Sequence, residues 1–289
     1  MTESVIVAVT APAVSFDLTT LATIKDDLRI PSTDTSSDLT LARYITEQSA
    51  LAAGYCNRIF AAESLTETLY LERDPFPYQV PGGVRQLQLS RWPLLSVTSV
   101  TQNDAGQSTL LTPYPGTDPT VPPDYQALNG PGQLIRLDSF GEQMTWPAVM
   151  YVIPYRAGFI APVDPWLASA AIPFGAVRAN GGGLYLCTAP GTTAASGGPA
   201  GTGAAITDGT VTWSYVSAVA PRTLPYDLEM AVLRLVVNRF LERSRDPFLK
   251  RTEDPRVGVK EYWVGSTHDG PFPPEVVAVL DRYRVPVTA

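Results

Sequence analysis

The chain has 289 residues, enough for one large domain or two smaller ones. Hydrophobic residues make up 45% of it and charged residues 17%, which excludes an intrinsically disordered protein. The net charge of −7 argues against a surface built to hold nucleic acid tightly. The 27 Pro and 22 Gly residues predict many turns and a β-rich body.

The first predicted elements are two helices near the N-terminus. Residues 1–16 contain no basic residue and make a poor signal peptide, and no run of about 18 apolar residues predicts a membrane span. Residues 17–30 predict a short helix, with Asp17 or Thr19 as its cap and Pro31 as its stop. A longer helix is predicted from about Ser37 to Ile59, with its apolar side chains on one face (Leu41, Ile45, Ala52, Cys56 and Ile59).

The middle of the chain predicts β-structure in two parts. Residues 64–156 contain short apolar runs separated by turn residues, and Asn103-Asp104-Ala105-Gly106 predicts a hairpin turn. Residues 166–219 differ in composition, because they hold only two charged residues, Arg178 and Asp208, and are rich in Gly, Ala, Ser and Thr. This stretch predicts a small inserted β module with a long flexible loop.

The C-terminal part of the chain predicts helices again. Residues 225–245 predict a strong helix that starts at Pro225. Residues 272–284, FPPEVVAVLDRYR, predict a short helix, since Pro273 and Pro274 suit a first turn. Its apolar face is formed by Val276, Val279, Leu280 and Tyr283. A helix of about three turns is marginal alone in water, so it needs a surface on its own subunit or on another protein.

These elements together predict an α+β fold. We expect a helical bundle with a β-sheet portion, plus an inserted small all-β module and an extended C-terminal arm that ends in a short helix. The expected division places the body in residues 1–165 and 222–260, the inserted module in 166–221 and the arm in 261–289.

Positive signs of catalysis are absent from the sequence. The single histidine, His268, stands in a polar linker, and no Cys or His residues have metal-ligand spacing. The sequence also lacks a phosphate-binding glycine loop placed between a strand and a helix, and a nucleophile elbow. We therefore expect neither an enzyme nor a bound cofactor or metal.

Several segments, taken in order, resemble the head-to-tail connector (adaptor) family of tailed double-stranded DNA bacteriophages and related prophages. The resemblance covers most of residues 16–165 and 222–284, and the order and spacing of the segments carry it. The inserted module departs from the family pattern. The resembling segments are LTTLATIKDDLRIP, LARYITEQSALAAGYCNRIF, RWPLLSVTSV, YRAGF, LPYDLEMAVLRLVVNRFLER and FPPEVVAVLDRYR.

The resemblance implies a structural protein of the virion neck that is assembled in the host cytoplasm. Such subunits form a ring, typically of twelve, that joins the portal to a head-closure or tail protein. DNA passes through the ring without specific binding, and no membrane is involved. The portal-contact role carries over to Pro274, Val276, Val279, Leu280, Tyr283 and Arg284.

Three alternatives stay open at this point. In the first, the chain is a head-closure or tail-completion protein, a neighbouring role in the same neck. In the second, it is a carbohydrate-binding or adhesion protein that acts through the inserted module. In that second case Tyr185, Trp213 and Tyr215 would stack on a sugar, although the aromatic core of a small β module explains them better. In the third, the terminal helix folds back on its own subunit.

Overall fold

The computed structural model describes residues 5–71, 86–116, 120–147, 149–244, 251–254, 258–261 and 272–285. The chain divides into two compact units. Unit 1 comprises Met1–Ala13 and Ala61–Phe159, and unit 2 comprises Val14–Phe60 and Ile160–Ala289. The three-part domain division expected from the sequence stays a prediction.

The expected fold class is wrong. Within the described part of the chain, 34% is strand and 23% is helix, with four α-helices and several antiparallel sheets. The protein is therefore mostly β-sheet and not a helical bundle with a sheet portion. One reason is that Val5–Ala11, which we did not expect to form an element, is a full strand paired with Glu63–Tyr70.

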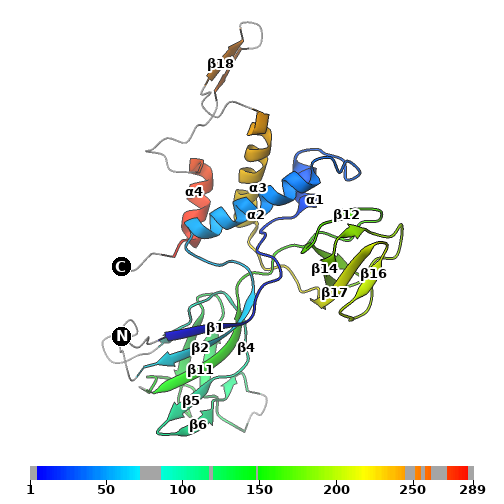
Figure 1. Ribbon diagram of the computed structural model, residues 1–289. Helices are drawn as coiled ribbons and strands as arrows, with labels where there is room; N and C mark the ends of the chain where they lie inside the picture. The colour runs from blue at the N-terminus through cyan, green and yellow to red at the C-terminus, as the bar shows by residue number, and fades with distance from the viewer. Residues whose placement is uncertain are drawn as a thin grey trace. The chain divides into compact units, whose positions relative to one another are not determined.

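Unit 1 is built on a six-stranded sheet with the order β1-β2-β11-β5-β6, in which β4 also pairs with β11 (Figure 1). All of its pairings are antiparallel. The predicted hairpin turn is confirmed, since it joins β5 to β6. The strands are β1 (Val5–Ala11), β2 (Glu63–Tyr70), β4 (Leu94–Val97), β5 (Thr101–Asp104), β6 (Gln107–Leu110) and β11 (Met150–Ala157).

A second sheet completes unit 1. Its order is β10-β9-β8-β7, and β3 pairs with β9. Leucine and aromatic side chains from both sheets form one hydrophobic core, which includes Leu69, Leu87, Leu134 and Tyr151. The strands are β3 (Gln86–Gln88), β7 (Pro113–Tyr114), β8 (Tyr125–Leu128), β9 (Gln133–Leu137) and β10 (Gln143–Met144).

A buried carboxyl group lies in this core. Glu67 of β2 is fully buried, and it accepts hydrogen bonds from the Ser90 amide (3.0 Å), the Ser90 hydroxyl (2.9 Å) and the Tyr155 hydroxyl (2.7 Å). Burial raises the pKa of Glu67 above its ordinary value, although these hydrogen bonds lower it in part. The folded state therefore favours the protonated form of this group.

We expect Glu67→Gln to reduce the change in the free energy of unfolding between acid and neutral pH. Because the folded-state pKa is raised, the contribution of Glu67 to stability is complete below its unfolded pKa of about 4.5 and declines as pH rises through the folded value. A glutamine amide fills the same volume, accepts from the Ser90 amide and Tyr155, and donates to the Ser90 hydroxyl. Thermal unfolding between acid and neutral pH measures the effect. Glu142→Gln, an exposed control in unit 1, should follow the wild-type curve.

Unit 2 contains the four helices, and they match the predicted segments: α1 (Leu21–Asp27), α2 (Asp38–Tyr55), α3 (Tyr226–Leu241) and α4 (Pro274–Leu280). The cap of α1 is Thr20, not Asp17 or Thr19, and its hydroxyl accepts from the Thr23 amide at 3.1 Å. Short 3₁₀ turns follow α3 (Glu242–Ser244) and α4 (Asp281–Tyr283). The strands β18 (Arg251–Asp254) and β19 (Gly258–Glu261) form an antiparallel hairpin.

Two charged residues fix the first helix of unit 2. The Lys25 ammonium is buried and donates to the carbonyls of Ser32 and Asp34 and to Asp38 Oδ1 at 2.9 Å, so it holds the loop between α1 and α2. Asp164 accepts from the amides of Leu21 and Ala22 at the start of α1. Both groups are satisfied, which identifies them as structural.

The stretch expected to be an inserted module forms β-strands between Ala171 and Ala218. Its main sheet has the order β13-β14-β17-β16, and β12 pairs with β15 (Figure 1). The expected long flexible loop is instead held in place, since Asn180 Nδ2 donates to the carbonyls of Gly197 and Pro199, and the Tyr185 hydroxyl donates to the Gly201 carbonyl. The strands are β12 (Ala171–Ile172), β13 (Val177–Asn180), β14 (Gly183–Ala189), β15 (Gly191–Thr192), β16 (Ile206–Asp208) and β17 (Val211–Ala218).

Candidate functional site

The C-terminal helix α4 is the element to which the family resemblance assigns the portal contact. Pro273 stands at its N-cap with extended backbone (φ −56°, ψ 143°), and Pro274 begins the helix, as predicted. Glu275 adds a negative charge to the first turn, where the helix dipole favours it. At seven residues the helix is too short to persist alone, so its stability depends on packing.

That packing comes from its own chain, because α3 contacts both α2 and α4. Val276 and Leu280 are 1% and 0% exposed. Phe272, which precedes the helix, is 4% exposed and meets the Tyr55 ring edge-to-face at a centroid distance of 5.5 Å. The apolar face of α4 is therefore anchored within unit 2.

A polar set of contacts surrounds this apolar anchor. The Tyr283 hydroxyl donates to Asp227 Oδ1 at 2.6 Å, and the Tyr55 hydroxyl donates to Asp281 Oδ1 at 2.7 Å. Burial and the Asp227 carboxylate both raise the pKa of Tyr283, so the phenol stays protonated and remains a donor. These contacts fix the rotation of the helix as well as its position.

Cys56, at the end of α2, completes the junction. Its carbonyl accepts from the Val285 amide at 2.9 Å, and its thiol donates to the Leu280 carbonyl at 3.4 Å. Burial raises the pKa of the Cys56 thiol to about 11. The thiol is therefore protonated at neutral pH and has a packing role, not a nucleophilic one.

The six expected portal-contact residues fall into three groups. Val276 and Leu280 are buried against the chain itself, Val279 and Tyr283 are half-buried, and Pro274 and Arg284 are exposed. While α4 is docked in this way, a partner can reach only the last two residues and the outer parts of Val279 and Tyr283. The role of the six as portal contacts stays a prediction.

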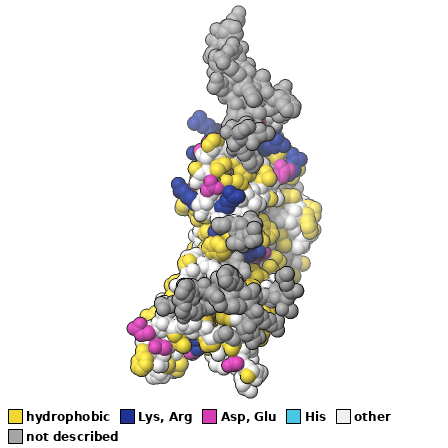
Figure 2. All heavy atoms as spheres, turned by 90° about the vertical axis from the view of Figure 1, so that its left-hand side faces the viewer, with side chains coloured by type: hydrophobic (Ala, Val, Ile, Leu, Met, Phe, Trp, Pro, Cys, Tyr) yellow, Lys and Arg dark blue, Asp and Glu magenta, His cyan; other side chains and the backbone are white. Residues whose placement is uncertain are grey.

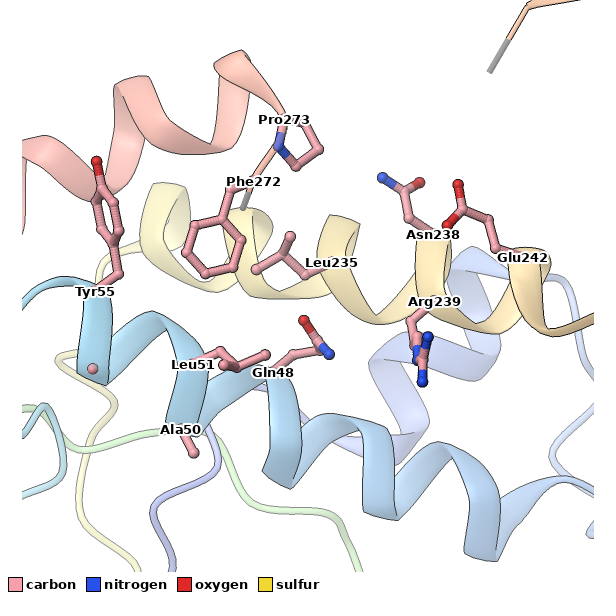
Figure 3. Close-up of a pocket in the computed structure, with 11 residues that line it drawn as sticks. Gln48, Ala50, Leu51, Tyr55, Leu235, Asn238, Arg239, Glu242, Phe272 and Pro273 are labelled. Carbon is pink, nitrogen blue, oxygen red and sulfur yellow. The ribbon is translucent and has the colours of Figure 1, made fainter. Parts of the chain in front are cut away.

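A groove of about 440 Å³ lies beside the start of α4. Figure 3 shows Phe272 pointing into the space between α2 and α3, near Leu51 and Leu235. Leu235 is 7% exposed, whereas Leu51 is 52% exposed. The lining residues are Gln48, Ala50, Leu51, Gly54, Tyr55, Leu235, Asn238, Arg239, Glu242, Phe272 and Pro273.

The groove has an apolar centre and charged neighbours. Arg239 and Glu242 line it, and the Arg284 guanidinium lies 5.2 Å from the ring centroid of Tyr55, which also lines it. Figure 2 shows Lys and Arg side chains distributed over the helical part of the molecule. A helix or extended segment that inserts an apolar side chain beside an acidic group fits this chemistry.

Sequence reasoning did not identify the groove. The signal it missed is Leu51, which lies off the apolar stripe of the second predicted helix and remains half exposed in the structure. Leu39 of the same helix is also off the stripe and exposed but does not line the groove, so exposure alone does not identify this surface.

The aromatic residues of the inserted module form its core. Trp213 is 0% and Tyr185 4% exposed, and Tyr215 packs against Tyr185 edge-to-face at 5.8 Å. Asp208 holds the core together, because its Oδ2 accepts from the indole groups of Trp166 (2.7 Å) and Trp213 (3.1 Å). In this arrangement neither Trp213 nor Tyr185 has a free ring face for a sugar.

The remaining candidate groups are a metal site, a membrane span and the single histidine. In the part of the chain that the structure describes, no three His, Cys, Asp or Glu side chains gather as a metal site. None of the helices in the described ranges has the length and hydrophobicity needed to cross a membrane. His268 lies outside the described residues.

No protein-family model and no curated protein matches this sequence. Among solved structures, the chain is similar to one from the neck of an empty gene transfer agent particle computed with C6 symmetry. That likeness has 15% identity and a TM-score of 0.42, and covers 98% of this chain and 97% of the other. A chain from a native gene transfer agent virion has 14% identity and a TM-score of 0.40, with the same coverage. Likeness at this level establishes neither a shared fold nor a shared function.

Proposed function

We propose that the protein is a structural subunit of a virion neck, an adaptor that joins the portal to the next neck or tail protein as a ring around the DNA channel. The resemblance of six segments, in order, to the connector family supports this role. The net charge of −7 suits a channel through which DNA slides without binding, because negative charge repels the phosphate backbone.

The observation that carries the proposal is the surface formed where α4 docks. The chain returns at its C-terminus to α2 and α3, and Phe272 and Pro273 form one side of an apolar groove. Pro274 and Arg284 belong to the same terminal segment as Phe272 and Pro273, and Arg284 lies over the ring of Tyr55, which lines the groove. We assign this surface to the portal contact, with Val276 and Leu280 as anchors of α4 and Pro274, Val279, Tyr283 and Arg284 facing the partner.

We expect Leu51→Asp to weaken binding to the portal protein of the same particle by about 30-fold, since disrupting a contact anchor costs about 2 kcal/mol. Leu51 is 52% exposed, so the fold should tolerate the charge. Binding of the purified full-length variant to immobilised portal measures the effect. Leu39→Asp is the matched control, because Leu39 is on the same helix, is 74% exposed and does not line the groove.

Arg284→Glu tests the other end of the same surface. We expect it to weaken portal binding and to reduce the salt dependence of that binding, as the loss of a charged contact does. Arg43→Glu is its control, since Arg43 is exposed on α2 and contacts its helix neighbours Glu47 and Tyr44. Wild-type portal binding by both Leu51→Asp and Arg284→Glu would rule out this surface. Strong binding to a tail protein with none to the portal would instead support the head-closure or tail-completion role.

A further inference from the structure

In the main sheet of unit 1, the central strands have buried side chains, whereas the side chains of the two edge strands, β1 and β6, are exposed. The central strands β2 and β11 alternate between buried and partly exposed residues, as expected for a sheet with one face on the core. In β1 every residue after Val5 is exposed, and in β6 all residues are exposed. Among the described strands, β1 pairs only with β2 and β6 only with β5 (Figure 1).

β1 lacks the features that usually protect an edge strand. Its sequence, VIVAVTA, contains no charge and no proline, and β-branched residues dominate it. Ile6, Val7 and Val9 are 44%, 40% and 48% exposed. Its one irregularity is a bulge between Val9 and Ala11, at the end of the strand. An apolar, uncharged edge of this kind is a template for pairing with another strand.

β6 is a second uncharged edge at the opposite end of the same sheet. Its sequence is QSTL, and Leu110 is 68% exposed. The turn before it consists of Ala105 and Gly106, both with positive φ (46° and 84°), which is the geometry of a tight hairpin. Pairing the two edges would bury no charged side chain of either strand.

The strand directions and faces of the two edges are compatible. Four successive antiparallel pairings separate β1 from β6, so the two strands run in the same direction. Val7 of β1 pairs with Glu67 of β2. At the other edge, Thr109 of β6 pairs with Gln102 of β5, and Gln102 in turn pairs with Tyr151 of β11. Glu67 and Tyr151 are both core-facing, so Val7 and Thr109 lie on the same face of the sheet. Ala8 lies on the other face.

We propose that β1 of one copy pairs in parallel with β6 of the next copy, so that the sheet continues from subunit to subunit. Two different edges on one chain form a head-to-tail contact, which closes into a ring when the rotation between copies allows it. Closure into a ring rests on the proposed neck function, whereas the contact itself rests on the two edges of unit 1.

Disulfide trapping of the full-length chain tests this contact. We expect Val7→Cys/Thr109→Cys to form a ladder of covalent oligomers under mild oxidation, about 100-fold faster than random collision, because paired strands hold the thiols at high effective concentration. The matched control is Ala8→Cys/Thr109→Cys, whose thiols lie on opposite faces at every register that keeps the core faces of the two copies on the same side of the sheet. The natural Cys56 and Cys187 are 0% exposed and should not interfere.

The outcomes separate the possibilities. A ladder from the same-face pair alone, removed by Ile6→Lys with unchanged thermal unfolding, supports the proposal. Equal cross-linking of the same-face and opposite-face pairs, or none from either, overturns it. Dimers from Val7→Cys alone indicate β1–β1 pairing between two copies and also overturn it. A ladder that persists with Leu51→Asp separates this contact from the portal surface, so the two proposals can fail independently.

Discussion

Leu280→Ala is expected to destabilise the helical part of unit 2 by about 3 kcal/mol, because a fully buried leucine is replaced by a cavity. Leu280 is 0% exposed, and its carbonyl accepts from the Cys56 thiol. Since α4 is too short to persist without packing, most of this loss should appear as undocking of the helix. Urea unfolding followed by circular dichroism gives the total, and hydrogen exchange of the Val285 amide reports the undocking.

Two further variants show whether the docked helix is the cause. Val279→Ala changes a half-buried residue of the same helix and should cost less than about 1 kcal/mol. Tyr283→Phe removes one hydrogen bond to Asp227 and should cost about 1 kcal/mol. Unchanged stability in Leu280→Ala would mean that α4 does not rest on its own body. Val276 and Leu280 would then be available as direct portal contacts, as the family resemblance first implied.

The helices of unit 2 could be predicted because their signals are local. The apolar stripe that contains Leu41, Ile45 and Cys56 identifies α2, and Pro273 and Pro274 mark the start of α4. The sequence predicts the cap of α1 one to three residues too early, since Thr19 and Thr20 are the same residue type and only the fold distinguishes them. Thr19 instead donates to Glu229 Oε1 of α3, a partner far away in the chain.

Composition predicts a β-rich body, but the strand β1 and its pairing could not be predicted from local signals. Val5–Ala11 shows no alternation, because both faces of β1 are apolar and exposed, and its partner β2 lies more than fifty residues further along the chain. The groove posed the same difficulty, since α2, α3 and Phe272 meet only in the folded chain. The aromatic core of the inserted module was easier, because Tyr185, Trp213 and Tyr215 stand in two short β-like runs, GLYLCT and TVTWSYV, that the sequence itself shows.

Asp208→Ala should unfold the inserted module or reduce its stability by about 4 kcal/mol. The carboxylate is 5% exposed and accepts from two indole groups and from the Ala194 amide at 2.9 Å. Its removal leaves one buried donor, the Trp213 indole, and two part-buried donors, the Trp166 indole and the Ala194 amide, without an acceptor. Loss of the partner of a buried donor costs about 1–3 kcal/mol. The core around Trp213 is small, with five fully packed side chains, so it has little stability in reserve.

Asp208→Asn keeps the side-chain volume and changes only the charge and one hydrogen-bonding atom. Comparing it with Asp208→Ala therefore separates these effects from the loss of volume. The single side-chain oxygen of the asparagine can still accept from both Trp166 and Trp213, but its amide group faces the Ala194 amide, so we expect a loss of about 1–2 kcal/mol. Tryptophan fluorescence during unfolding measures both variants, because two of the five tryptophans in the chain bind Asp208 directly. Wild-type stability in Asp208→Ala would show that this carboxylate does not hold the rings in the core.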